Sequence, residues 1–346
     1  MARKKLLISI IIANYNGSYF LKDCIDSILK EKSPSYEIIV VDDCSIDNSI
    51  SILKRYEKNN QLRLIALKIN KGAAHARNVG AKKSNGDILF YLDYDTILTP
   101  GWGSALRIFF STYPKAGMAQ AKILRKGTHQ FDYAGDYISS FGFLVERAQA
   151  ALDTGQFDTI DRVFSVRGAA MIIRKRVFDV VGGFDESYGY YWEEPDIAWR
   201  MWLCGYEVYF LPTVTVYHAF GTDEKQVEYY INNDIIFKGS RNAITTMIKN
   251  YESKNLFLRL PIHILFWMTL SIPIFIKGEF SKSYAILRGI GWNISHLYLI
   301  LAKRSKIQAS RVRSDADVFE LVGSSQSAKY YLSKAISFVI GKPYNI

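Results

Sequence analysis

Three short apolar runs, each ending in polar residues, constrain the fold of this chain more than any other feature. With the polar residues that follow them, the runs are residues 6–13 before Asn14, residues 38–41 before Asp42 and Asp43, and residues 89–92 before Asp93. Apolar runs without alternation are typical of strands that are buried on both faces. Segments with helical spacing separate them, at residues 19–29, 48–56 and 73–83. Strands and helices that alternate at short intervals predict parallel βαβ units and an α/β fold.

The third run ends in two aspartates, Asp93 and Asp95, which are separated by one residue. Ligands of parallel sheets bind outside the carboxyl ends of the strands, where an Asp-x-Asp pair can hold a divalent cation against phosphate oxygens. Asn14, Asp42 and Asp43 end the neighbouring strands, so we expect them on the same edge of the sheet. The alternative for the Asp-x-Asp pair alone is a surface turn with two solvated aspartates.

Four motifs in this order resemble the nucleotide-sugar-dependent glycosyltransferases of family 2, with a rhamnosyltransferase-like pattern. They are Ser-Ile-Ile-Ile-Ala-Asn-Tyr-Asn at 9–16, Val-Asp-Asp-Cys-Ser-Ile-Asp at 41–47, Asn-Lys-Gly at 70–72 with Ala-Arg-Asn-Val-Gly at 76–80, and Leu-Asp-Tyr-Asp at 92–95. The resemblance implies the GT-A fold, a Rossmann-like, mixed and mostly parallel sheet flanked by helices. The sequence contains no glycine-rich dinucleotide fingerprint and no P-loop, so it has neither of these binding motifs for nicotinamide cofactors or ATP.

A second cluster of motifs extends the resemblance. It consists of Val-Arg-Gly-Ala-Ala-Met at 166–171, Gly-Gly-Phe-Asp-Glu at 182–186 and Trp-Glu-Glu-Pro-Asp-Ile-Ala-Trp-Arg at 192–200. In the family, the second acid of the last motif deprotonates the acceptor hydroxyl, and here that position is Glu194, with Glu193 and Asp196 as rivals. The chain departs from the commonest pattern by carrying Glu-Glu rather than Glu-Asp, with Pro195 directly after it. Proline suits a first helical turn, so we expect a helix whose positive end lies near the acids. The alternative is an acidic helix start that serves only the helix dipole.

The resemblance also implies the donor and metal sites. The donor would be bound by Asn14, Asp42, Asp43, Arg77 and Asp93, with Asp42 and Asp43 at the base and the ribose. Mg²⁺ or Mn²⁺ would be held by Asp93, Asp95 and His218. His218 belongs to the strand-like alternation at residues 214–221, which delivers it to a loop, and the alternative for it is a purely structural histidine.

The activity that this resemblance implies is metal-dependent and inverting. One sugar would pass from a nucleoside-diphosphate sugar to a hydroxyl of a glycan or lipid-linked acceptor. A catalytically silent sugar-nucleotide-binding or scaffold protein of the same fold stays open, although acids at every motif position count against it. A nucleotidyltransferase is a third hypothesis, but it would be expected to carry a glycine-rich phosphate loop, which residues 9–16 are not.

Length and charge divide the chain in two. Its 346 residues exceed one typical core, which predicts a catalytic domain at 1–224 and a helical region at 225–346. The first part carries 27 Lys and Arg against 26 Asp and Glu, whereas the second carries 17 against 7, within a total net charge of +11. The second part also holds apolar residues 260–276 and 284–301. Apolar helices with flanking cations suit an anionic membrane surface. Because the run at 260–276 is shorter than the roughly 20 residues of a span, we expect a monotopic or re-entrant element, with a single span as the alternative.

Two other interpretations of the basic region remain, a helical subdomain that packs on the core or forms a homodimer, and an RNA-binding surface. Its apolar density exceeds what a nucleic-acid surface needs, so we expect no nucleic-acid partner. Basic residues before the run at 6–13 mimic a signal peptide, but no small-residue cleavage site follows, so we interpret the run as the first strand. Scattered cysteines, Cys24, Cys44 and Cys204, favour free thiols in a reducing compartment. The expected location is therefore the cytoplasmic face of the cell membrane.

Overall fold

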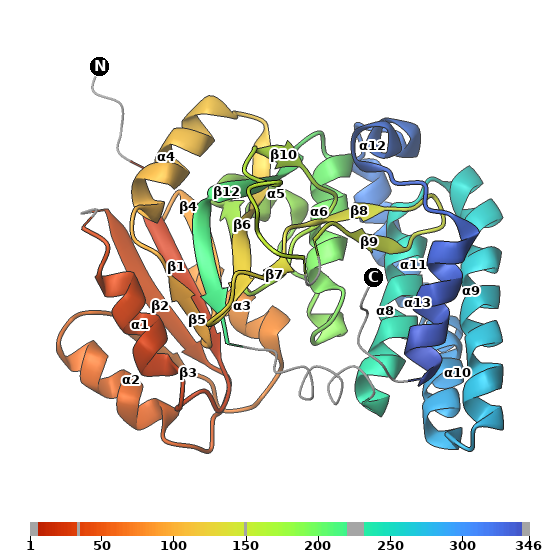
Figure 1. The fold of residues 1–346 in the computed structure, drawn as a ribbon, viewed down its shortest axis with the longest axis horizontal. Coiled ribbons are helices and arrows are strands. Elements are labelled where there is room, and N and C mark those ends of the chain that lie inside the picture. The colour runs from red at the N-terminus through yellow and green to blue at the C-terminus, as the bar shows by residue number, and fades with distance from the viewer. Residues whose placement is uncertain (1–5, 33–34, 149–150, 220–231, 341–346) are drawn as a thin grey trace.

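A mixed ten-stranded sheet forms the centre of the computed structural model, which describes residues 6–32, 35–148, 151–219 and 232–340 (Figure 1). The strand order is β10-β12-β6-β11-β4-β1-β2-β3, while β5 pairs with β12 and β7 with β6. The strands are β1 Ile8–Asn14, β2 Tyr36–Asp42, β3 Arg63–Ala66, β4 Ile88–Asp93, β5 Thr96–Leu98, β6 Ala116–Arg125, β7 Phe131–Tyr133, β10 Asp161–Arg162, β11 Ala170–Arg174 and β12 Glu207–His218. A separate hairpin pairs β8, Asp136–Ile138, with β9, Leu144–Glu146. Strands β1 to β4 are parallel to one another, and β11 is antiparallel to β4 and β6, as the mixed sheet expected from the sequence requires.

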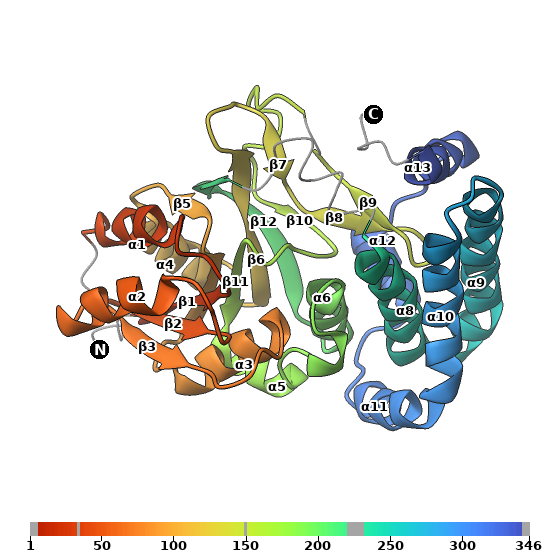
Figure 2. The same cartoon turned by 90° about the horizontal axis from the view of Figure 1, so that it is seen from below.

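Both faces of the sheet are covered. Within β1, Ile8, Ile10 and Ile12 pack into one hydrophobic core and Ile11 into the other, because successive side chains point to opposite faces. The helices of this part are α1 Leu21–Leu29, α2 Ser49–Lys58, α3 Ala73–Lys83, α4 Trp102–Thr112, α5 Lys175–Val181 and α6 Glu193–Leu203, with a 3₁₀ turn at Glu186–Tyr188. Figure 2 shows these helices on either side of the strands. The expected burial of the apolar runs on both faces is confirmed.

The parallel register brings the polar strand ends together. Asn14 at the end of β1 is paired with Asp42 at the end of β2, and Ala13 with Asp93 at the end of β4. The polar residues singled out in the sequence therefore meet at one edge of the sheet.

A layer of helices follows the sheet in the chain and packs beside α6 (Figure 1). Its members are α8 Asn233–Asn250, α9 Ser253–Ile276, α10 Phe280–Ser295, α11 Leu297–Ala309, α12 Asp315–Val322 and α13 Ala328–Ile340. Helix α8 is the inner member, because most of its side chains are buried, and α12 returns to contact α6 and β8. The predicted division at residue 224 lies outside the described residues and stays a prediction.

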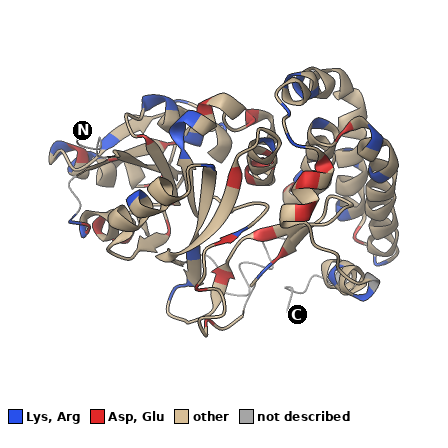
Figure 3. Ribbon diagram, turned by 90° about the horizontal axis from the view of Figure 1, so that it is seen from above, with Lys and Arg blue, Asp and Glu red and all other residues tan. Residues whose placement is uncertain are grey.

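The outer helices of this layer expose many apolar side chains. Among the described residues, α9 is long and apolar enough to cross a membrane. Only 22% of its most apolar 18-residue stretch is buried in the protein. Its exposed members include Phe257, Leu265, Ile272 and Ile276. Helices α10 and α11 meet the same criterion only as a pair bent by 68°. Figure 3 shows Lys and Arg spread over these helices, whereas acidic residues gather toward the middle of the molecule.

Candidate active site

The ends of β1 and β2 form one wall of the candidate site. Asn14 Nδ2 donates to Asp42 Oδ2 at 2.7 Å, and the Ser45 hydroxyl donates to the same oxygen at 2.6 Å. The Ser45 backbone N–H donates to Asp42 Oδ1 at 2.9 Å, so both oxygens of this buried carboxylate are used inside the protein. Asn14 and Asp43 line the main cavity. Asp42 thus fixes the loop and Asn14, while Asp43 lies where a ligand can reach it.

The loop before α3 is folded onto Asp43. Backbone N–H groups of Lys71 and Gly72 donate to its carboxylate at 3.0 and 2.7 Å. Gly72 has a φ of +89°, and a Cβ there would lie 2.8 Å from the carbonyl oxygen of Gly189. The Asn-Lys-Gly motif therefore needs its glycine for both the backbone conformation and the close packing.

Asp93, Asp95 and His218 come together at the centre of the site. Each can offer one ligand atom, and these atoms lie within 4.8 Å of one another. His218 Nε2 is 3.3 Å from Asp95 Oδ1, and His218 Nδ1 is 2.9 Å from Asp132 Oδ2. Burial lowers the pKa of His218, but hydrogen bonds to Asp132 and Asp95 outweigh it and raise that pKa to about 10. Two carboxylates and one neutral imidazole are a suitable ligand set for Mn²⁺ or Mg²⁺, so these residues fit the expected metal once the cation displaces the proton of His218 Nε2.

Arg77 holds the acidic residues of the site in place. Its Nη1 donates to Glu193 Oε1 and to Glu194 Oε1, both at 3.0 Å, and its Nη2 donates to Asp93 Oδ1 at 3.2 Å. Burial lowers the pKa of Arg77, but the surrounding carboxylates outweigh it and raise that pKa, so the guanidinium stays charged. The structure thus places Arg77 among the acids, between the metal ligands and the start of α6.

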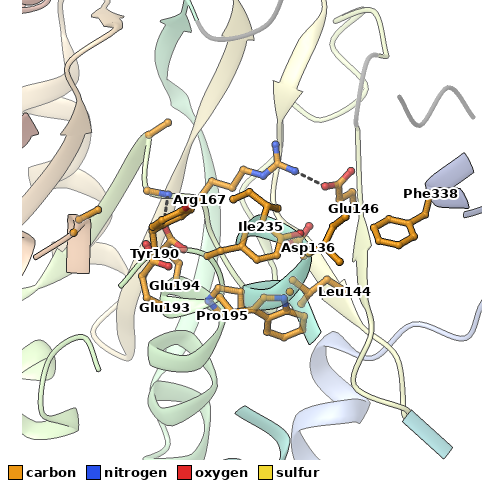
Figure 4. Close-up of a pocket in the computed structure, with 18 of the residues that line it drawn as sticks. Asp136, Leu144, Glu146, Arg167, Tyr190, Glu193, Glu194, Pro195, Ile235 and Phe338 are labelled. Carbon is orange, nitrogen blue, oxygen red and sulfur yellow. Dashed lines mark hydrogen bonds and ion pairs between the residues drawn. The ribbon is translucent and has the colours of Figure 1, made fainter. Parts of the chain in front are cut away.

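The candidate base, Glu194, lies in the first turn of α6 and lines the cavity, as does Glu193 (Figure 4). The Gly168 backbone N–H donates to Glu194 Oε1 at 3.1 Å, the oxygen that Arg77 also holds. Burial and the neighbouring Glu194 raise the pKa of Glu193 to about 8. This raised pKa favours the protonated form of Glu193, which makes Glu193 less suited than Glu194 to act as the base.

Asp196, the third rival for the base, does not line the cavity. Its side chain is fully buried on the other side of α6, where Lys249 Nζ lies 2.9 Å from Oδ1 and Arg200 donates to Oδ2 at 3.0 Å. This placement favours Glu194 over Asp196 as the base. The expected helix start is confirmed, with Pro195 in the first turn.

Asp132 escaped the sequence reasoning, whereas Gly168 and Trp192 lie in quoted motifs but owe their roles to contacts that only the structure shows. Asp132 orients His218 but stands 86 residues before it and belongs to no motif. A Cβ at Gly168 would lie 1.9 Å from Arg77 Nη2, so this glycine is required by packing. Tyr191 and Trp192, directly before the acids, have φ values of +73° and +79°, a strained conformation of the kind that clusters at functional sites.

The cavity extends well beyond the strand ends, with a volume of about 960 Å³. Its second half lies between the β8–β9 hairpin and helices α8, α9 and α13. Figure 4 shows Arg167, Asp136 and Glu146 there, next to Leu144, Ile235 and Phe338. This volume is near the upper end of the range of about 300–1,000 Å³ that is typical of ligand pockets.

Comparison with known proteins agrees with this geometry. Residues 9–179 match the family model "Glycosyl transferase family 2". The poly-beta-1,6-N-acetyl-D-glucosamine synthase of Staphylococcus epidermidis is 28% identical over 208 residues, which are 59% of this chain and 48% of that protein. The chain thus spans about half the length of the curated relative it matches.

Solved structures share the fold at low sequence identity. GalNAc-T7 with UDP, GalNAc and Mn²⁺ has a TM-score of 0.64 at 18% identity, covering 96% of this chain and 58% of that one. S. aureus TarS 1-349 in complex with UDP-GlcNAc has a TM-score of 0.57 at 17% identity, covering 98% and 93%. These likenesses confirm the expected GT-A-like architecture.

Proposed function

We propose that this chain, whose residues 9–179 match the model of glycosyl transferase family 2, is a metal-dependent, inverting transferase that acts with nucleotide sugars. The observation that carries the proposal is the shared cavity: the Asp93, Asp95 and His218 cluster and the Glu194 carboxylate line the same space. Transfer from a nucleoside diphosphate to a hydroxyl requires a divalent cation and a base. The Asp93, Asp95 and His218 cluster would hold the cation, and Glu194 would be the base.

The donor is placed against the ends of β1, β2 and β4. In this proposal, Asp43 and Asn14 contact the nucleoside, and Asp93 with Asp95 face the diphosphate. When bound, Mg²⁺ or Mn²⁺ supplies positive charge that stabilises the departing diphosphate. UDP-N-acetylhexosamines are the first donors to test, since a curated relative is named for an N-acetylglucosamine polymer and a structural neighbour holds UDP-GlcNAc.

The acceptor is deprotonated by Glu194. Its Oε1 is fixed by Arg77 and by the Gly168 N–H, which leaves the second oxygen to take the proton of the attacking hydroxyl. Attack from the α6 side, with the diphosphate held on the strand side, would invert the anomeric centre. Neutral Glu193 would lower the repulsion around Glu194 as the charge there changes.

We further propose that the enzyme docks on the cytoplasmic face of the cell membrane and modifies a glycan or a lipid-linked acceptor there. Supporting this, α9 carries the exposed apolar residues Phe257, Leu265, Ile272 and Ile276, within a region of 17 Lys and Arg against 7 Asp and Glu. The catalytically silent alternative predicts donor binding without turnover.

Substitution at Glu194 tests the chemistry. Glu194→Gln keeps shape and hydrogen bonding but removes the base, so turnover should fall by about 10²-fold or more while donor affinity persists. Glu193→Gln is the matched control: the raised pKa of Glu193 favours its neutral form, which glutamine resembles, so the loss should be much smaller. The measurements are release of nucleoside diphosphate with octyl glycosides as acceptors, and calorimetric donor affinity. If Glu193→Gln or Asp196→Asn were inactive and Glu194→Gln active, the assignment of the base would be wrong.

A further inference from the structure

Two carboxylates face each other in the half of the cavity that lies beyond Glu194. Asp136 begins β8 and Glu146 ends β9, and the antiparallel register places them directly opposite one another. Like charges in such cross-strand positions are destabilising. The hairpin therefore keeps an arrangement that costs stability, and both residues line the cavity.

Asp136 is the buried member of the pair, with 4% of its surface exposed. Its Oδ2 accepts hydrogen bonds from the Tyr133 hydroxyl and from the Ser165 hydroxyl, the latter at 2.9 Å. Among the described residues its Oδ1 has no hydrogen-bond partner, and the same holds for Glu146 Oε2. Burial and repulsion by Glu146 raise the pKa of Asp136 to about 7. A buried polar oxygen without a partner is costly, which points to a donor that arrives with a ligand.

Arg167 connects this pair to the catalytic residues. Its guanidinium forms an ion pair with Glu146 Oε1, and the next residue in the chain, Gly168, donates its N–H to Glu194 (Figure 4). The Arg167 and Glu146 side chains are 30% and 23% exposed, and both residues line the cavity. Lys334 of α13 lines the same region, and the carboxylates Glu146 and Asp136 act on it electrostatically.

Asp136, Glu146, Arg167 and Lys334 together offer two carboxylates and two cations. This group thus has both hydrogen-bond acceptors and donors without a large net charge. An anionic ligand would meet the two carboxylates, and a cationic ligand would meet Arg167 and Lys334. A neutral ligand with several hydroxyl groups can instead donate to the carboxylates and accept from the guanidinium.

We propose that Asp136, Glu146 and Arg167 form the subsite for the sugar ring of the acceptor, and that this sugar is neutral. This inference rests on the proposed function, which requires an acceptor hydroxyl beside Glu194. In the complex the sugar hydroxyls donate to Asp136 Oδ1 and to the Glu146 carboxylate, which requires both side chains to turn toward the cavity on binding, because Asp136 Oδ1 and Glu146 Oε2 are buried. The apolar wall beyond, with Leu144 and Phe338, then faces the aglycone of the acceptor.

Titration calorimetry with octyl glycosides of glucose, galactose and N-acetylglucosamine tests the subsite, with 1-octanol as the probe without a sugar. The full chain is titrated with and without UDP and Mn²⁺. At least one glycoside should bind more tightly than octanol. Glu146→Gln and Asp136→Asn should each weaken that glycoside by about 10-fold or more, as expected for hydrogen bonds to charged groups, and leave UDP affinity unchanged.

Asp23→Asn removes a carboxylate that is 60% exposed on α1 and should change nothing. Because Asp136 is buried, a melting curve checks that its variant is folded, and the more accessible Glu146 gives an independent variant. Equal glycoside affinity in wild type and both variants would overturn the proposal, as would glycosides that bind no better than octanol. Failure of UDP to bind would count against the proposed function alone, since the glycoside titrations without UDP still test the subsite.

Discussion

Lys249 of α8 is expected to be one of the main stabilising residues of the molecule. It is 1% exposed, and its Nζ lies 2.7 Å from Asp185 Oδ2 and 2.9 Å from Asp196 Oδ1. Replacement by Met keeps most of the volume but removes the charge from between two buried carboxylates. Breaking a buried ion pair costs about 3–5 kcal/mol.

The lower end of this range applies here, because each carboxylate keeps a second cation. Lys303 lies 2.6 Å from Asp185, and Arg200 lies 3.0 Å from Asp196. We therefore expect Lys249→Met to lower the free energy of unfolding by about 3 kcal/mol at pH 7. At about 2 °C per kcal/mol for a large domain, this corresponds to a decrease in Tm of about 6 °C.

The loss of stability in Lys249→Met should change with pH in a defined direction. Burial raises the pKa of Asp185 and of Asp196, but Lys249 and a second cation outweigh it, so both pKa values lie below the ordinary range. Carboxylates with lowered pKa stabilise the fold above their unfolded pKa of about 4, and that stability is lost as the pH falls through the folded pKa. The difference in Tm between wild type and Lys249→Met should thus be full at pH 7 and shrink below about pH 4.

Thermal and urea unfolding across this pH range measure the effect. Lys22→Met is the matched control, since Lys22 is 74% exposed in its pair with Asp26 and should have no measurable influence. A Tm for Lys249→Met equal to that of wild type at pH 7, or a difference that grows in acid, would refute the reasoning.

Two further predictions concern the metal and the membrane. Transfer should vanish in excess EDTA and return with Mn²⁺. Asp95→Ala should lose the response to Mn²⁺, whereas the control Asp23→Ala should keep it. Full activity of the metal-free enzyme would contradict the metal site. Anionic liposomes should bind the protein at low salt, with about 1 kcal/mol of attraction per basic residue near the surface. Ile272→Glu with Ile276→Glu should release it, whereas Ile108→Glu, 66% exposed on α4, should not; binding that is equal in all forms, or absent in wild type, would rule out docking through α9.

Much of the sheet could be predicted because its central strands are buried on both faces and so are continuously apolar. The helix expected at residues 73–83 is α3 with the same bounds, and the run before Asp93 is β4. The strand-like segment expected at residues 214–221 begins inside the longer β12, Glu207–His218, and residues 220 and 221 lie outside the described residues. The strands β7, β8 and β9 are three residues each, too short to give a period, so the hairpin with Asp136 and Glu146 was not foreseen.

The candidate site was predictable where chemistry follows a motif and not where it depends on tertiary contacts. Asp93, Asp95 and His218 do converge, although 122 residues separate the last two in the sequence. The family resemblance favoured Glu194 over Asp196 as the base, but spacing alone could not exclude Asp196, since both residues open the same helix. Two residues correspond to roughly 200° around an α-helix, so one carboxylate faces the cavity and the other the buried cations. Only the position of α8, which supplies Lys249, determines that Asp196 faces the buried cations and Glu194 the cavity.

The helical layer therefore has a role on both of its sides. On the inner side, Lys249 of α8 and Lys303 of α11 bind Asp185, which stands just before the 3₁₀ turn and the acids of α6. On the outer side, α9 exposes the apolar residues proposed to meet the membrane. Because α8 packs against both α6 and α9, the outer face is rigidly related to the Glu194 carboxylate. Docking through α9 would thus fix the distance of the catalytic base from the membrane surface, and with it the part of a membrane-bound acceptor that can reach the cavity.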